Sequence, residues 1–329
     1  MEATYILPIR RQALGDITEL TRYLRAVAIH MDVVVVDGSP PAVFAAHHAP
    51  WSRFALHIPP DPDCDTPNGK VNGVVTGVRH ARHECIIIAD DDVRYGVAAL
   101  KRVIALLAHV HLVRPQTYFD PLPWHAYWDT ARTLLNRATG GDWPGTLGVR
   151  RSALLATGGY AGVLFETLEL VRTIRAAGGA EAVPLDLFVR RIPPTAQHFW
   201  SQRVRQAYDE FARPLRFVVW LAVLPVAITL SLRRAWALLS VSALACIGLA
   251  EIGRRRGGGL AVFPASAALL APLWVLERTI CTWLALGARL LLGGVPYHGK
   301  LVLRAATPWR ELQRRYAGVL EPAVGSDVP

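Results

Sequence analysis

The chain has 329 residues, enough for one large domain or two ordinary ones. Its net charge of +10 would suit nucleic acid, an anionic lipid surface or an anionic substrate, but no aromatic-basic pattern of a nucleic-acid module is apparent, which argues against nucleic acid as a partner. The four cysteines show no CxxC spacing, which argues against a zinc site and against a disulfide framework.

The first 110 residues alternate between apolar runs and segments of helical periodicity. Strands are predicted over residues 5–9, 32–37 and 85–89, and helices over residues 16–29, 68–82 and 96–109. Asp16 is a plausible N-cap for the first helix. Strands that alternate with helices at this spacing predict a mostly parallel α/β sheet.

Two of the predicted strands end in acids. Asp37 closes the second strand, and Asp90, Asp91 and Asp92 follow the third. In open α/β sheets, ligands bind just beyond the carboxyl ends of the strands, where adjacent acids call for a compensating cation. Hard divalent cations such as Mg²⁺ and Mn²⁺ prefer oxygen ligands and pair with phosphates. The pattern therefore indicates a metal and nucleotide edge, with a solvated acidic turn as the alternative.

Other common site patterns are absent from the sequence. No GxGxxG follows the first strand and no GxxxxGK[ST] occurs, which argues against a classical dinucleotide fold and against a P-loop. His47, His48 and the histidines between residues 80 and 83 lack zinc-ligand spacing, so we expect them on the surface.

The second half of the chain is apolar. Four segments carry few or no charges, namely Phe217–Leu232, Ala235–Ile252, Leu260–Leu276 and Thr279–Leu292. Because a span needs about 20 residues and at least about 17, we predict two to four membrane segments, the last either a span or a re-entrant or interfacial helix. With four crossings, the largest arginine clusters share one side, which the positive-inside rule makes the cytoplasm. A hydrophobic soluble helical domain is the alternative.

A series of motifs runs in order through residues 1–215. It comprises residues 35–39 (VVDGS), 68–73 (NGKVNG), 90–93 (DDDV), 145–154 with 158–160, 165–170 with 175–179, and 202–206 (QRVRQ). The series resembles glycosyltransferase family 2, which has a GT-A catalytic domain, and within it the membrane-anchored members like ceramide glucosyltransferase. The predicted domains are thus a GT-A domain over residues 1–215, membrane or interfacial helices over residues 216–293, and a basic cytoplasmic tail over residues 294–329.

The resemblance implies an inverting, metal-dependent hexosyltransferase. It would move a sugar from a UDP- or GDP-sugar to a lipid or lipid-linked acceptor at the cytoplasmic face of the cell membrane. Asp90 and Asp92 would hold Mg²⁺ or Mn²⁺, and Glu166 and Thr167 would lie at the catalytic position. The residues expected on the nucleotide side are Pro8, Asp37, Lys70, Asp91, Gln202 and Arg205.

Two positions depart from the family pattern. Thr167 follows Glu166 where the family has a catalytic Asp, so either Glu166 is the base, or Glu169 serves, or the activity is altered. Gln206 replaces the Trp of the QxxRW motif. A nucleotidyltransferase and a catalytically altered membrane scaffold therefore remain as alternatives.

Overall fold

The computed structural model describes residues 1–297, 300–302 and 304–320, so the predicted basic tail lies in part outside the described residues. Contacts divide the chain into two units, and neither unit is continuous in sequence. The α/β unit combines Met1–Pro115, Pro144–Val183 and Thr307–Pro329, and the helical unit combines Gln116–Trp143 and Pro184–Ala306. The domain boundary expected at residue 215 stays a prediction.

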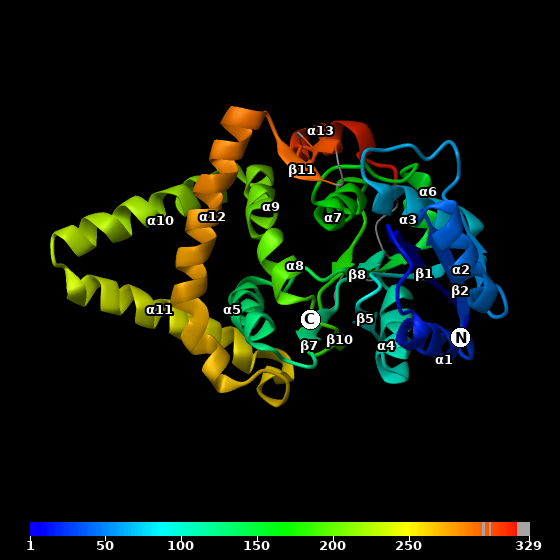
Figure 1. Ribbon diagram of the computed structural model, residues 1–329, viewed down its shortest axis with the longest axis horizontal. Coiled ribbons are helices and arrows are strands. Elements are labelled where there is room, and N and C mark those ends of the chain that lie inside the picture. The colour runs from blue at the N-terminus through cyan, green and yellow to red at the C-terminus, as the bar shows by residue number, and fades with distance from the viewer. Residues whose placement is uncertain (298–299, 303, 321–329) are drawn as a thin grey trace. The chain divides into compact units, whose positions relative to one another are not determined.

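The α/β unit is built on a mostly parallel sheet (Figure 1), which confirms the predicted fold class. Its strand order is β3-β2-β1-β4-β8-β6-β9, and β8 is antiparallel to both of its neighbours. The strands are β1 (Ala3–Ile9), β2 (Asp32–Asp37), β3 (Leu56–Ile58), β4 (Cys85–Ala89), β6 (Leu112–Val113), β8 (Thr146–Arg150) and β9 (Glu181–Ala182). The apolar side chains of β1, β2 and β4 are buried, as expected for strands covered on both faces.

The helices of this unit include the three predicted from periodicity. They are α1 (Thr18–Ala28), α2 (Pro41–Trp51), α3 (Gly69–His80), α4 (Val97–Leu107), α6 (Arg151–Ala156), α7 (Glu166–Ala176) and α13 (Trp309–Tyr316). Asp16 does accept a hydrogen bond from Thr18 N at 2.8 Å, although α1 begins two residues later than predicted. Helix α3 lies very close to β1, because a Cβ at Gly77 would come within 2.5 Å of the Ile6 side chain.

The end of the described chain returns to the α/β unit and packs on α7. Leu312 and Tyr316 of α13 are buried against Ala176 and Ala177. The backbone N–H of Leu320 donates to Ala177 O at 2.8 Å. Residues far apart in sequence thus complete one folded unit.

The helical unit contains a short parallel strand pair, β7 (Gln116–Phe119) and β10 (Phe188–Arg191), and a set of helices. The helices are α5 (Trp124–Thr139), α8 (Ala196–Ser201), α9 (Arg203–Tyr208), η1 (Asp209–Ala212), α10 (Pro214–Leu232), α11 (Trp236–Arg255), η2 (Arg256–Ala261), η3 (Ala265–Leu270) and α12 (Ala271–Leu292). A small hairpin, β11 (Val295–Tyr297) with β12 (Lys300–Val302), follows α12.

Among the described residues, three helical segments are long and apolar enough to cross a membrane. They are Pro214–Leu232, Trp236–Ala261 and Ala265–Leu292. From Ala265 onward, the third predicted segment continues into the fourth as one helical segment, because Glu277 and Arg278 do not interrupt α12, whereas Leu260 and Ala261 belong to the helical segment before it. Each of these two charges is paired inside the unit, Glu277 with Arg203 and Arg278 with Glu210.

Candidate active site

Lys70 connects the acidic end of β4 to the start of α7. Its ammonium lies 2.5 Å from Asp90 Oδ1 and 2.7 Å from Glu166 Oε1. Asn68 caps α3 by accepting from Lys70 N at 3.1 Å, which places the lysine in the first turn of that helix. Burial would lower the pKa of Lys70, but the charges of Asp90 and Glu166 outweigh it and raise the pKa above its usual value. The lysine is therefore a permanent cation between two carboxylates.

Asp90 is held by the backbone of the loop that precedes β8. Its N–H donates to Gly145 O at 3.0 Å, and its own carbonyl accepts from Val93 N at 3.1 Å. A Cβ at Gly145 would lie 2.1 Å from Asp90 Oδ2, so only glycine leaves room for this carboxylate. The sequence pattern gave Gly145 only as part of a longer motif, and its contact with Asp90 could not be read from spacing.

The other acids of this strand end lie beside Asp90. Asp91 has a side chain that is 44% exposed and pairs with Arg11 at 3.4 Å. Arg11 also donates its backbone N–H to Ser39 Oγ at 2.9 Å, which joins the acidic turn to the end of β2. Asp92 is half-buried. The carboxylate oxygens of these acids are the kind of ligand that Mg²⁺ and Mn²⁺ prefer. The absence of a Cβ at Gly145 leaves room for the Asp90 carboxylate among them.

Glu166 is the first residue of α7, and Thr167 holds it in place. Thr167 Oγ1 donates to Glu166 Oε1 at 2.8 Å, so the residue that departs from the family pattern acts on the neighbouring carboxylate. Glu169, the alternative base, is fully buried, and its Oε2 accepts from Thr307 N at 2.7 Å. Of the two glutamates, the structure brings Glu166 to Lys70 and Asp90.

Tyr160 is a buried side chain near the same charges. Its side chain is 6% exposed, and within the described residues its hydroxyl makes no hydrogen bond. Burial raises the pKa of the phenol well above its usual value, and the charges of Glu166 and Asp90 raise it further. The phenol is therefore a neutral donor beside the two carboxylates.

Asp37 lies at the end of β2 and is 1% exposed. Its Oδ1 accepts from Ser39 N at 2.9 Å, while Oδ2 lies 2.6 Å from His47 Nδ1 and 3.2 Å from His57 Nε2. Burial would raise the pKa of Asp37, but the hydrogen bonds from His57, Ser39 and His47 lower it well below its usual value.

The expectation that His47 is a surface residue is wrong, because the buried Asp37 carboxylate needs donors and His47 on α2 supplies one. Sequence reasoning also missed His57, which sits on β3 and reaches Asp37 only once the sheet has formed. His48 and His80 are exposed, as expected. Nothing in the sequence around His47, His48 and His57 indicated a contact with Asp37.

The remaining predicted residues fall in two places. Pro8 is half-buried near the end of β1, where a Cβ at Gly73 of α3 would lie 2.8 Å from the Pro8 Cβ. Gln202 and Arg205 belong to the helical unit, where Arg205 Nη2 donates to Gln202 Oε1 at 2.8 Å. Their role as ligands of a diphosphate stays a prediction.

A family model matches part of the α/β unit. The model of glycosyl transferase family 21 matches residues 43–119, a segment that includes Lys70 and the three acids Asp90, Asp91 and Asp92. No curated protein matches the chain. The expected type of enzyme is confirmed at the level of a GT-A-type glycosyltransferase domain, whereas membership of family 2 stays a prediction.

Several solved structures are similar to this chain at low identity. A mannosyltransferase from Pyrobaculum calidifontis, solved with GDP-Man and Mn²⁺, is 18% identical over 86% of this chain and 87% of its own, with a TM-score of 0.48. Mannosyl-3-phosphoglycerate synthase from Rubrobacter xylanophilus is 12% identical over 60% and 69%, with a TM-score of 0.40. Glucosyl-3-phosphoglycerate synthase from Mycobacterium tuberculosis, with Mn²⁺, UDP-Glc and phosphoglyceric acid, is 13% identical over 60% and 74%, with a TM-score of 0.43.

Proposed function

Because the α/β unit is a glycosyltransferase domain of the GT-A type, we propose that this chain transfers a hexose from a nucleotide-diphosphate sugar to an acceptor hydroxyl, with inversion at the anomeric carbon. The observation that carries the proposal is the position of Lys70 between Asp90 and Glu166. Lys70 joins Asp90, at the acidic end of β4, to Glu166, at the start of α7. An inverting transfer needs a site for the metal and diphosphate and a carboxylate base, and these two acids are proposed to supply them.

Glu166 is the proposed base. Its Oε1 accepts from Lys70 and Thr167, and Oε2 is the oxygen proposed to take the acceptor proton. As the acceptor oxygen bonds to the anomeric carbon, the bond from that carbon to the diphosphate oxygen breaks and its electron pair leaves with the nucleoside diphosphate. The hydroxyl proton passes to Glu166. Such a base typically contributes about 10²–10⁴-fold to the rate.

The donor side is proposed at the carboxyl ends of β1, β2 and β4. Asp90 and Asp92 would hold Mg²⁺ or Mn²⁺, which supplies positive charge against the leaving diphosphate. Lys70 is a fixed cation at the same place. The residues proposed to line the UDP or GDP part of the donor are Pro8, Asp37, Asp91, Gln202 and Arg205.

The acceptor is proposed to be a lipid or a lipid-linked glycan, and the enzyme to lie at the cytoplasmic face of the cell membrane. The support is that the same chain carries apolar helices long enough to enter a bilayer. Transfer to lipid extracts is expected, with little or none to soluble acceptors. Transfer to soluble acceptors alone would contradict the lipid part of the proposal.

The test is a panel of nucleotide sugars offered to the full chain with Mn²⁺ or Mg²⁺. Free nucleoside diphosphate and a glycosylated lipid are the expected products, and Asp92→Asn should abolish their formation. Asp63→Asn is the matched control, because Asp63 is an exposed acid of the same unit that pairs with Arg79. Release of pyrophosphate would indicate a nucleotidyltransferase instead, and no turnover with any donor would indicate a scaffold.

A further inference from the structure

The number of membrane crossings is constrained by the way the chain enters and leaves the α/β unit. Residues 144–183 and residues 307–320 both belong to that one unit. Thr307 N donates to Glu169 Oε2 at 2.7 Å, and Leu320 N to Ala177 O at 2.8 Å. A folded unit lies on one side of a membrane, so the chain between these residues crosses an even number of times. Three apolar helices cannot therefore all be spans.

Helix α12 is bound along its length to the polar segment formed by α9 and η1. The contacts are Arg203 Nε to Glu277 Oε1 at 2.9 Å, Arg278 Nη2 to Glu210 Oε1 at 2.6 Å, and Arg289 Nη1 to the Tyr208 hydroxyl at 3.1 Å. From residue 277 to residue 289, this is about 18 Å of helix axis at 1.5 Å per residue. If α12 crossed the bilayer, it would draw the α9 and η1 segment into the hydrocarbon.

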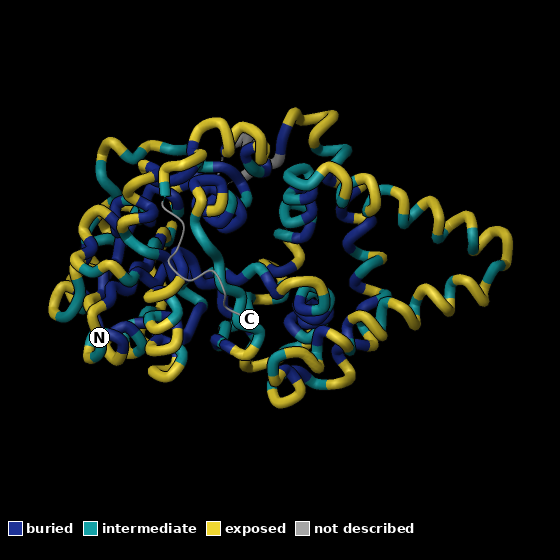
Figure 2. The backbone as a smooth tube through the Cα atoms, turned by 180° about the vertical axis from the view of Figure 1, so that it is seen from behind, coloured by how far each residue is buried: buried dark blue, intermediate teal, exposed yellow. Residues whose placement is uncertain are grey.

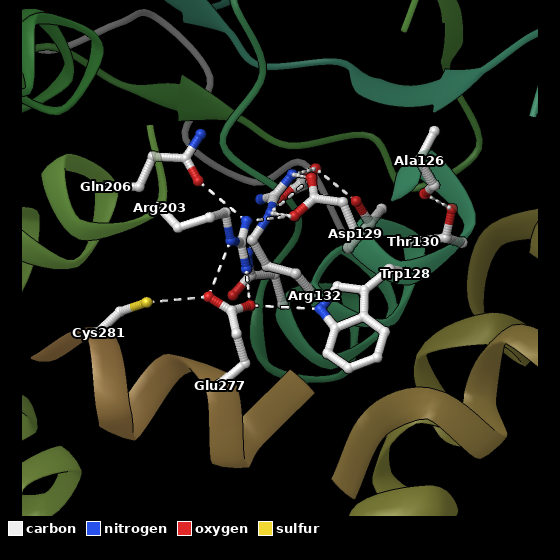
Figure 3. Close-up of polar contacts among 12 residues, drawn as sticks. Ala126, Trp128, Asp129, Thr130, Arg132, Arg203, Gln206, Glu277 and Cys281 are labelled. Carbon is white, nitrogen blue, oxygen red and sulfur yellow. Dashed lines mark hydrogen bonds and ion pairs between the residues drawn. The ribbon is translucent and has the colours of Figure 1, made fainter. Parts of the chain in front are cut away.

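That segment belongs to a buried network of charges. Figure 3 shows Arg203 between Glu277 of α12 and Asp129 of α5, with Trp128 also bonded to Glu277. Arg132 pairs with the same Asp129. A charged side chain at the centre of a bilayer costs several kcal/mol. A network of this size therefore belongs outside the hydrocarbon, and α12 with it.

Helices α10 and α11 are mostly exposed, and the buried residues of α11, Ala250 and Gly253, lie in its last two turns. No residue of α10 is buried, and residues 217–232 carry no charge. The two helices have 19 and 20 residues, which at 1.5 Å per residue is about 28 Å and about 30 Å, close to the thickness of a bilayer core. Arg213 and Arg216 flank the start of α10, and residues 254–256 are arginines at the end of α11.

Within the helical unit, α12 contacts the N-terminal part of α10, where Thr279 Oγ1 donates to Trp220 O at 2.6 Å and Trp283 Nε1 donates to Leu221 O at 3.1 Å. α10 and α11 form a V, joined at Arg233 and Arg234, and α12 runs across its open end (Figures 1 and 2). The outward face of α12 is apolar and exposed, with Ile280 47%, Trp283 41% and Leu284 54% exposed. A helix with one face tied to a polar segment and the other apolar is typical of the membrane surface.

We infer that α10 and α11 cross the bilayer as a helical hairpin, while α12 lies in the membrane surface on the side of the α/β unit. The hairpin tip, at Arg233 and Arg234, is on the far side. Five arginines border the open end, at positions 213, 216 and 254–256, against two at the tip. The positive-inside rule therefore assigns the open end, and the α/β unit with it, to the cytoplasm.

The test is labelling of single cysteines by a membrane-impermeant maleimide, in intact cells and in everted vesicles that carry the full chain. The variants are Arg233→Cys at the hairpin tip, Ser266→Cys before α12 and Leu291→Cys at the end of α12. Ala13→Cys, exposed in the α/β unit, marks the side of that unit. Labelling is compared with that of the chain with its native cysteines, and each variant must keep the parent melting temperature. Ser231→Cys replaces the tip variant if Arg233→Cys does not fold.

The expected pattern is Arg233→Cys on the side opposite the marker, with Ser266→Cys and Leu291→Cys on the marker side. If Leu291→Cys were labelled on the far side together with Arg233→Cys, while Ser266→Cys stayed on the marker side, the chain would cross three times and the proposal would be overturned. Ser266→Cys on the far side would make α12 a span. A tip cysteine on the marker side, or one labelled only after detergent, would overturn the crossing hairpin. The labelling pattern does not depend on turnover. The proposed topology can therefore be wrong while the proposed transfer is right, and the proposed transfer can be wrong while the topology is right.

Discussion

Each unit of the molecule places one cation between two carboxylates, and the two arrangements differ in burial and in the kind of cation. In the α/β unit, Lys70 bridges Asp90 and Glu166, and the three side chains are 20%, 26% and 14% exposed. In the helical unit, Arg203 bridges Asp129 and Glu277 and is 3% exposed.

The two cations differ in how readily they can change partners. A lysine ammonium is a point charge on a flexible stem, whereas the arginine guanidinium is a rigid fork that fixes its acceptors. Lys70 can turn from a carboxylate to an incoming phosphate. Arg203 cannot leave without removing the cation that Asp129 and Glu277 share. We therefore assign the lysine site to chemistry and the arginine site to the architecture of the helical unit.

Among substitutions at the lysine and arginine sites, Glu166→Gln should reduce activity most. Removing the proposed base should lower transfer about 10²–10⁴-fold while the melting temperature stays close to that of the parent chain. The measurement is product formation at saturating donor, beside a thermal melt. Glu169→Gln is the comparison variant, because Glu169 bonds the returning C-terminal segment. A larger loss of turnover at Glu169 than at Glu166 would reverse the assignment of the base.

Arg203→Gln should destabilise the helical unit. It would leave Asp129 and Glu277 without their shared cation, and breaking a buried ion pair typically costs about 3–5 kcal/mol of stability. Unfolding in detergent by denaturant or heat measures this loss. Arg205→Gln, on the same short helix, is the control and should cost far less. Equal melting temperatures for the parent chain and Arg203→Gln would show that the network is not structural.

The same network should make stability depend on pH. Burial would raise the pKa of Asp129, but the charges of Arg132 and Arg203 lower it to about 2. Because the folded pKa is below the unfolded value, the contribution is complete above about pH 4 and is lost as the pH falls toward 2. It amounts to about 2 kcal/mol at about 1.4 kcal/mol per pKa unit. Melts between pH 6 and pH 2 should show a smaller loss for Asp129→Asn than for the parent chain.

The smallest expected effect is that of Thr167→Val. It removes one hydrogen bond to Glu166 Oε1, about 1 kcal/mol and so roughly a five-fold drop in turnover. Thr167→Ser keeps the hydroxyl and should restore most of the rate. If valine and serine gave the same turnover, the hydroxyl would have no part in orienting the base.

Local patterns in the sequence predict much of the α/β unit. The apolar runs of β1, β2 and β4 and the Asn68 cap of α3 are visible in short windows, and so is the order of Asp37, Lys70, Asp90 and Glu166. These features depend on residues close together in sequence. The carboxyl ends of parallel strands then bring the acids to one edge without further information.

Contacts between distant residues account for what the sequence did not predict. The bond from His47 to Asp37 exists only once α2 packs behind β2, and the contact of Gly145 with Asp90 needs β8 beside β4. Glu277 and Arg278 look like an interruption of an apolar run until Arg203 and Glu210 neutralise them. A short stretch of sequence around Glu277 and Arg278 contains neither Arg203 nor Glu210, so these pairs cannot be predicted from it.

The return of residues 307–320 to α7 means that the α/β unit can be completed only late in synthesis. The α/β unit lacks the Leu312 and Tyr316 contacts until the ribosome has passed the apolar helices. Because domains generally fold as units and the N-terminal parts emerge first, the strands of this unit emerge before the segment that completes it. On the proposed topology, α10 and α11 enter the bilayer before the α/β unit is complete, and a chain released before residue 307 would lack part of that unit.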